Sequence, residues 1–139
     1  MEYPVVIAMV GGEGTRMFPL PLYQPKPLVP ICNHPTLLRV YEILAKQGVR
    51  EFIFATKGAE NTTRLKECFR YGDDFSKRLD LEPNVVFEYQ PNYDDMGSAD
   101  AVRFCMEYYD VKKDVLVVSG DAILDIDMEE IMEEHRRRD

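Results

Sequence analysis

Residues 4–16 read P-V-V-I-A-M-V-G-G-E-G-T-R, an apolar run that leads directly into three glycines, a threonine and an arginine. Residues 4–10 are continuously apolar and rich in β-branched side chains, which is typical of a strand covered on both faces. A strand of this kind belongs in a parallel sheet. The glycines therefore follow its carboxyl end, which is where doubly wound α/β folds bind their ligands.

Helices and strands are expected to alternate along the rest of the chain. The helical spacing of apolar residues and the β-rich runs predict helices over residues 36–47, 61–71 and 98–109, a short helical piece up to residue 79, a last helix after Asp127, and strands over residues 51–56, 85–89 and 114–119. Gly48 stands where the first helix should end, and Asp127 with Glu130 resembles a capping box. This order favours a Rossmann-like, doubly wound α/β fold with a mainly parallel sheet and helices on both faces.

Composition and charge exclude several classes of protein. The chain has 139 residues with 17 Lys and Arg against 25 Asp and Glu, a net charge of −8, so we expect one acidic domain without a general nucleic-acid surface. No apolar stretch is long enough to span a membrane, and residues 1–4 lack the features of a secretory signal, which predicts a cytoplasmic protein. The widely spaced Cys32, Cys68 and Cys105 favour free thiols over a disulfide frame or a zinc site.

The connection between the first strand and the first helix is unusually long. Residues 11–35 make up this loop, whereas βα loops usually take about 2–6 residues, and six of the nine prolines stiffen it. Gly11, Gly12 and Gly14 allow positive φ angles, so that successive N–H groups can converge on an anion such as a polyphosphate. Thr15 and Arg16 add a hydroxyl group and a cation beside them. The loop therefore indicates phosphate binding.

Neither the P-loop motif nor the dinucleotide fingerprint is present in this loop. No Gly-Lys pair is followed by Ser or Thr, and the glycines lead into a proline-rich stretch instead of a helix. Lys26 lies between Pro25 and Pro27, and the proline that follows holds its backbone extended. Arg16 and Lys26 are thus the two candidate cations of the loop.

The order and spacing of these residues resemble a known family. V-V-I-A-M-V-G-G-E-G-T-R-M-F-P-L at residues 5–20, followed by Q-P-K-P-L-V-P-I at residues 24–31, is similar to the N-terminal signature of the sugar-phosphate nucleotidyltransferases, or nucleotide-sugar pyrophosphorylases. The resemblance implies the nucleotide-diphospho-sugar transferase type of fold. It further implies that the loop from Gly11 to Thr15 holds the nucleotide phosphates, and that Arg16 and Lys26 stabilise the departing pyrophosphate.

Three later segments extend the resemblance. Gln90 resembles the family's glutamine that contacts the nucleobase. M-G-S-A-D-A at residues 96–101 is similar to the family's L-G-T-A-x-A turn, which implies nucleotide contacts for Gly97 and Ser98. S-G-D at residues 119–121 resembles the G-D motif, whose aspartate, Asp121 here, binds Mg²⁺ in the family.

The function implied by the resemblance is nucleotidyl transfer from a nucleoside triphosphate to a sugar 1-phosphate, giving an NDP-sugar and pyrophosphate. The match covers only about the first half of the family's catalytic domain. We therefore expect residues 1–139 to form a single domain that is the N-terminal portion of a longer one, and catalysis by this chain alone to be incomplete. The alternative is a non-catalytic nucleotide-binding or regulatory module of the same fold, and another kind of α/β nucleotide-binding protein is the third reading.

The identity of both substrates stays open at this point. Gln90 can serve several bases, and mannose, glucose and N-acetylglucosamine 1-phosphates and choline-phosphate-like acceptors are all compatible with the residues. The expected partners are thus these small molecules and Mg²⁺, without nucleic acid or membrane, and with either a homo-oligomer or a missing C-terminal half.

Overall fold

The computed structural model describes residues 3–9, 36–56, 59–91, 97–119 and 127–138. Their elements, in chain order, are β1 (Val5–Met9), α1 (Thr36–Gln47), β2 (Glu51–Ala55), α2 (Ala59–Phe69), α3 (Asp73–Leu79), β3 (Val86–Tyr89), α4 (Ser98–Tyr108), β4 (Val115–Ser119) and α5 (Met128–Arg137). Every helix and strand predicted from the sequence is confirmed, and the ends that can be compared shift by at most two residues.

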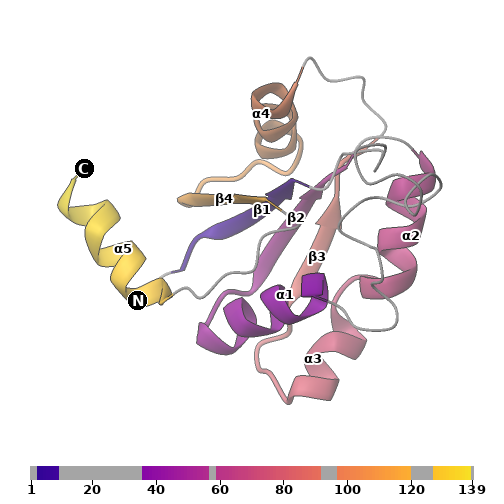
Figure 1. The fold of residues 1–139 in the computed structure, drawn as a ribbon, viewed down its shortest axis with the longest axis horizontal. Coiled ribbons are helices and arrows are strands. Elements are labelled where there is room, and N and C mark those ends of the chain that lie inside the picture. The colour runs from indigo at the N-terminus through magenta and orange to yellow at the C-terminus, as the bar shows by residue number, and fades with distance from the viewer. Residues whose placement is uncertain (1–2, 10–35, 57–58, 92–96, 120–126, 139) are drawn as a thin grey trace.

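The four strands form one parallel sheet in the order β3-β2-β1-β4 (Figure 1). The chain therefore runs from β1 outward through β2 to β3, and then returns past β1 to reach β4. This reversal creates a topological switch point between β1 and β4, where doubly wound folds open a ligand crevice at the carboxyl ends of the strands.

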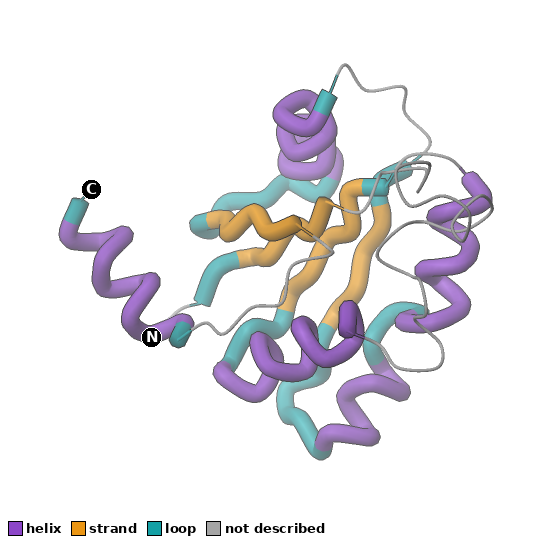
Figure 2. Tube along the Cα trace, in the orientation of Figure 1, coloured by secondary structure: helices purple, strands orange, loops and turns teal. Residues whose placement is uncertain are grey.

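Helices cover both faces of the sheet, as predicted. Figures 1 and 2 show α1, α2 and α3 on one face and α4 on the opposite face. Because side chains alternate along a strand, each inner strand contributes to both layers of the core. This two-sided burial explains the continuous apolar runs in the sequence.

The core on the side of α1, α2 and α3 is rich in aromatic rings. Phe54 lies at its centre, with ring centroids 5.2 Å from Tyr41, 5.1 Å from Phe69, 5.6 Å from Phe87 and 5.4 Å from Tyr89. The core on the α4 side is smaller and aliphatic, and its buried members are Val5, Ile7, Ile53, Ala55, Ala101 and Cys105. Cys105 is buried and forms no disulfide with another described residue, as expected, whereas Cys32 and the side chain of Cys68 lie outside the described residues.

Helix ends follow the signals that the sequence carries. Gly48 has a φ of 125°, its N–H donates to Ala45 O at 3.1 Å, and the Val49 N–H donates to Leu44 O at 3.2 Å. This pairing of a left-handed glycine with two backbone bonds ends α1. At α5 the Asp127 carboxylate accepts from the N–H groups of Glu129 and Glu130 at 3.0 and 3.3 Å, so the predicted N-cap is confirmed.

Within the described ranges, no helix has the length and apolar character needed to cross a membrane.

Candidate functional site

The carboxyl ends of the four strands lie along one edge of the sheet. Met9 at the end of β1 is the register partner of Ala55 on β2 and of Ser119 on β4. The segments that follow β1 and β4 therefore leave the sheet from neighbouring positions, at the topological switch point. This edge, with the start of α4, is the candidate site.

Seven predicted site residues lie outside the described residues: Gly11, Gly12, Gly14, Thr15, Arg16, Lys26 and Asp121. The structure gives the strand ends from which their segments depart. Gly11 follows Met9 by two residues, and Asp121 follows Ser119 by two residues. The glycine-rich loop and the G-D motif therefore follow the ends of two adjacent strands, β1 and β4. The roles of the residues themselves stay predictions.

Gln90 follows β3 at the same edge of the sheet. It is 3% exposed, and its N–H donates to Phe54 O on β2 at 2.9 Å. The fold therefore places Gln90 at the carboxyl edge that the sequence predicted for it. Its backbone is held by the neighbouring strand.

Gly97 and Ser98 form the start of α4. Gly97 has φ 127° and ψ −179°, and a Cβ atom at this position would meet no atom within 4 Å. Glycine is therefore required here by the backbone conformation and not by a lack of space. The Ala101 N–H donates to Gly97 O at 3.0 Å, which sets the direction in which the helix begins.

Thr56 also lies at this edge and was not among the residues predicted from the sequence. It directly follows β2, it is 4% exposed, and its hydroxyl group lies 2.6 Å from the Thr62 hydroxyl group on α2. Its position at the end of the strand predicted over residues 51–56 was the signal that could have identified it. The hydrogen bond joins the end of β2 to α2 at the edge where Gln90 lies.

Asp100, the acidic residue of the M-G-S-A-D-A segment, is engaged on the surface of α4. Its Oδ1 accepts from Arg103 Nε at 2.9 Å, and Glu107 Oε2 lies 2.8 Å from Arg103 Nη1. Hydrogen bonds to these two carboxylates raise the pKa of the exposed Arg103 guanidinium further above its usual range. Asp100 therefore takes part in a helix-surface ion pair, and we assign it no role in metal binding.

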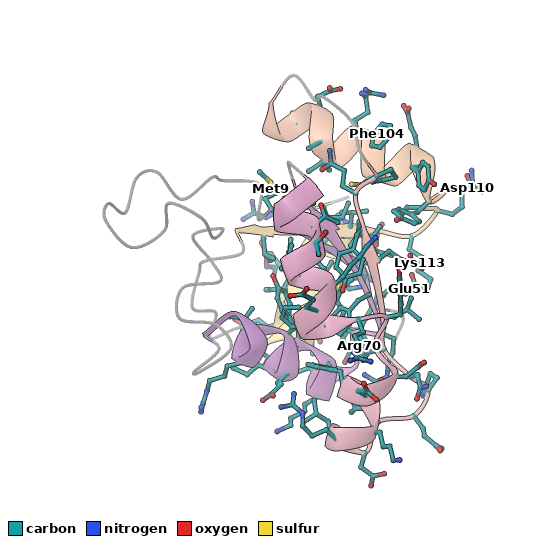
Figure 3. The ribbon with its side chains drawn as sticks, turned by 90° about the vertical axis from the view of Figure 1, so that its right-hand side faces the viewer. Met9, Glu51, Arg70, Phe104, Asp110 and Lys113 are labelled. Atoms are coloured by element: carbon teal, nitrogen blue, oxygen red, sulfur yellow. The ribbon has the colours of Figure 1, made fainter. Side chains whose placement is uncertain are left out.

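A pocket of about 380 Å³ lies at the opposite end of the sheet. Glu51, Asp110 and Lys113 line it, and Figure 3 shows these three residues on the side of the molecule away from Met9. Lys113 Nζ lies 3.3 Å from Glu51 Oε1, and burial raises the pKa of Glu88, which also lines the pocket. The strand residues that line this pocket come mainly from the amino-terminal halves of β1, β2 and β3, and Tyr109 also lines it.

A switch point between β1 and β4, helices on both faces and a glycine-led helix define a doubly wound α/β domain, a class that binds its ligands at the carboxyl edge of the sheet. The sequence model of one family, described as nucleotidyl transferase, matches residues 5–139. The chain belongs to this family.

Two curated relatives carry specific activities in their names. The Xenopus tropicalis protein named mannose-1-phosphate guanylyltransferase catalytic subunit beta is 34% identical over 131 residues, which cover 94% of this chain and 34% of that protein. The Campylobacter jejuni protein named D-glycero-alpha-D-manno-heptose 1-phosphate guanylyltransferase is 31% identical over 125 residues, which cover 90% of this chain and 51% of that protein. The chain thus spans about a third to a half of the length of these relatives.

Solved structures share the fold. A Bacillus anthracis protein assigned as a glucose-1-phosphate thymidylyltransferase matches with a TM-score of 0.75 and 24% identity, covering 96% of this chain and 50% of that one. A UTP-bound UGPase from Acinetobacter baumannii matches with a TM-score of 0.71 and 16% identity, covering 98% and 53%. These likenesses confirm the predicted fold class.

Proposed function

We propose that this chain forms the nucleotide-binding part of an enzyme that transfers a nucleotidyl group from a nucleoside triphosphate to a sugar 1-phosphate. The observation that carries the proposal is the register of Met9 with Ser119, because it starts the glycine-rich loop and the G-D motif from adjacent strand ends. Membership of the nucleotidyl transferase family supports the same reaction class.

GTP is the proposed nucleotide and a manno-configured sugar 1-phosphate the proposed acceptor. The Xenopus and Campylobacter relatives are both named as guanylyltransferases, and their named acceptors are mannose 1-phosphate and a manno-heptose 1-phosphate. These names narrow the choice that the sequence leaves open. The other bases and sugars are the competing outcomes of the test below.

In the proposed reaction a phosphate oxygen of the sugar 1-phosphate attacks the α-phosphorus of the triphosphate. A new phosphorus–oxygen bond forms, the bond to the β-phosphate breaks, and pyrophosphate leaves with the electron pair. Arg16 and Lys26 are the proposed catalytic residues, since cations placed beside the leaving group stabilise its developing charge. The backbone of Gly11, Gly12, Gly14 and Thr15 would hold the phosphates.

Asp121 is the proposed Mg²⁺ ligand. Among the described residues no group of three or more His, Cys, Asp or Glu side chains is arranged to hold a metal ion. A site of one carboxylate at a strand end, completed by phosphate oxygens, fits the way Mg²⁺ binds with nucleotides. The bound ion would neutralise the negative charge of the phosphates. The chain has a net charge of −8, so its own side chains can supply positive charge only locally.

The described domain is proposed to be the N-terminal portion of a longer catalytic domain, because it spans only about a third to a half of its curated relatives. The alternative, a non-catalytic nucleotide-binding module, would bind the triphosphate without releasing pyrophosphate. A cytoplasmic location stays a prediction of the sequence, which leaves the oligomeric state open.

Thermal unfolding with GTP, ATP, UTP, CTP and dTTP, each with and without Mg²⁺, tests the nucleotide site. A ligand at 100 times its Kd stabilises the folded state by about 2.7 kcal/mol, which raises the Tm by roughly 5–12 °C in a domain of this size. We expect GTP with Mg²⁺ to give the largest shift. No shift from any triphosphate would contradict the proposal.

Substitutions assign the shift to the predicted residues. Arg16→Ala, Lys26→Ala and Asp121→Ala should each reduce the GTP-dependent shift in Tm by more than half. Lys112→Ala is the matched control, since Lys112 is exposed and lies beside the pocket at the other end of the sheet. Pyrophosphate release from GTP that requires mannose 1-phosphate would then separate the enzyme from the binding module.

A further inference from the structure

Among the described residues, the outer edge of β3 is bonded by side-chain and loop contacts and not by another strand. The Phe87 N–H donates to Tyr71 O at 3.2 Å. Two residues later, the Tyr89 N–H donates to the Tyr109 hydroxyl oxygen at 3.3 Å, and the same hydroxyl group donates to Tyr89 O. Tyr109, which follows α4, therefore takes the place of a neighbouring strand at Tyr89.

This contact fixes the peptide unit that leads into Gln90. The carbonyl of that unit, Tyr89 O, accepts from Tyr109 on the outer side of β3. Its N–H, which belongs to Gln90, donates to Phe54 O on the inner side. Because both polar groups of the peptide are bonded, its plane cannot rotate without breaking a hydrogen bond. The bonded peptide therefore restrains the Cα atom of Gln90, from which its side chain departs.

Tyr109 is itself held firmly enough to act as such a contact. Its N–H donates to Cys105 O at 3.1 Å at the end of α4, and its ring packs edge-to-face on Tyr108 at 4.9 Å and against the core on the α4 side. Burial raises the pKa of Tyr109 to about 12, so the hydroxyl group keeps its proton near neutral pH and remains a donor.

We infer that Tyr109 is a positioning residue that orients Gln90 and thereby sharpens the selection of the nucleobase. The inference rests on the proposed function, and on the contact between Gln90 and the nucleobase that the family resemblance implies. Tyr109 touches neither nucleotide nor metal in this assignment. It acts through the backbone that it shares with Gln90.

Base selectivity measured on Tyr109→Phe tests the inference. The Kd values of GTP and ATP, each with Mg²⁺, are measured by titration calorimetry, and their ratio reports selectivity. We expect Tyr109→Phe to reduce this ratio about tenfold while the chain stays folded by circular dichroism. Tyr108→Phe is the matched control, because Tyr108 is the adjacent tyrosine and is 59% exposed, and it should leave the ratio unchanged.

A double-mutant cycle separates this role from a general loss of stability. Gln90→Ala should also reduce the ratio, and adding Tyr109→Phe to Gln90→Ala should change it no further, because the two residues act in one chain of contacts. Amide hydrogen exchange gives a direct readout: Gln90 N–H should exchange faster in Tyr109→Phe than in Tyr108→Phe, and the N–H groups of β1 should not.

The outcomes distinguish the inference from the function it rests on. If the wild-type chain binds neither GTP nor ATP, the proposed function is overturned and the inference with it. If Gln90→Ala reduces selectivity but Tyr109→Phe behaves like Tyr108→Phe in both selectivity and exchange, the inference alone is overturned. If the two single variants have additive effects, Tyr109 acts independently of Gln90 and the positioning role is wrong.

Discussion

Tyr41 places a hydroxyl group in the middle of the aromatic core. The residue is fully buried, its ring packs edge-to-face on Phe52, Phe54 and Phe69, and its hydroxyl oxygen has no hydrogen-bond partner among the described residues. A buried polar group without a partner loses its hydration and gains nothing in return. The Tyr41 ring therefore stabilises the core by packing, whereas its buried hydroxyl group lowers the free energy of unfolding.

Tyr41→Phe should leave the free energy of unfolding unchanged or raise it by up to about 1 kcal/mol at neutral pH. Burial raises the pKa of Tyr41 far above its usual value, so the folded state resists ionisation while the unfolded state ionises above about pH 10. Tyr41 therefore leaves the wild-type free energy of unfolding independent of pH below pH 10 and lowers it as the pH rises above 10. The advantage of Tyr41→Phe over the wild type should grow by about 1.4 kcal/mol for each pH unit above 10, as measured by urea unfolding.

A Tyr41→Phe variant that is less stable than the wild type at pH 7, by more than Tyr108→Phe, would show that the hydroxyl group has a partner after all. A difference between Tyr41→Phe and the wild type that does not change from pH 7 to pH 11 would contradict the burial of a neutral tyrosine at this position.

At the scale of the element, α5 shows how two short contacts attach a helix to the domain. Asp127 caps the first turn, and the Gln47 side-chain oxygen at the end of α1 accepts from the Met128 N–H at 2.6 Å. Met128 is fully buried and Met132 is 3% exposed, both in the core on the α1 side. The cap and the two methionines together determine where α5 begins and which face it buries.

Asp127→Ala should lower the free energy of unfolding by about 1 kcal/mol, because two N–H groups of the first turn lose their acceptor and the helix dipole loses a negative charge. Asp127→Asn is the matched control, since an asparagine oxygen can still accept both bonds. Chemical denaturation followed by circular dichroism measures both variants. Equal losses in the two variants would assign the effect to charge and not to capping.

The helices and strands were predictable because their signals are local. Apolar spacing fixed the helix over residues 36–47, Gly48 its end and Asp127 the start of the last helix, and all three are confirmed. The strand order β3-β2-β1-β4 could not be predicted, because an apolar run does not indicate which other strand pairs with it. The contact of the Tyr109 hydroxyl group with β3 joins residues twenty positions apart and carries no sequence pattern.

The candidate site was predictable to the extent that its residues follow strands. Gln90 and Gly97 lie at the carboxyl edge as expected, because parallel strands bring their ends together whatever lies between them. Thr56 obeys the same rule, yet a single threonine after a strand is too common to be noticed. The remaining site residues stay predictions that the substitutions above can test.

At the scale of the whole molecule, the aromatic core and the ligand edge share the same strand. Phe54 contributes its ring to four aromatic contacts and its carbonyl oxygen to the Gln90 N–H. The same residue therefore stabilises the domain with its ring and holds the backbone of Gln90 with its carbonyl oxygen. Stability and base selection should consequently respond to different changes at this strand.

Phe54→Ala should lower the free energy of unfolding by about 3–5 kcal/mol, because it removes a fully buried ring and leaves a cavity among the remaining ones. Domains of this kind are stable by about 5–15 kcal/mol in total, so the urea midpoint should fall sharply while the slope m stays constant. Val86→Ala, on the neighbouring strand and 40% exposed, should cost less than about 1 kcal/mol. Below its midpoint, Phe54→Ala should keep the wild-type ratio of Kd values for GTP and ATP, since the carbonyl that holds Gln90 is unchanged. A loss of selectivity in folded Phe54→Ala would show instead that the ring, and not the hydrogen bonds on either side of β3, orients Gln90.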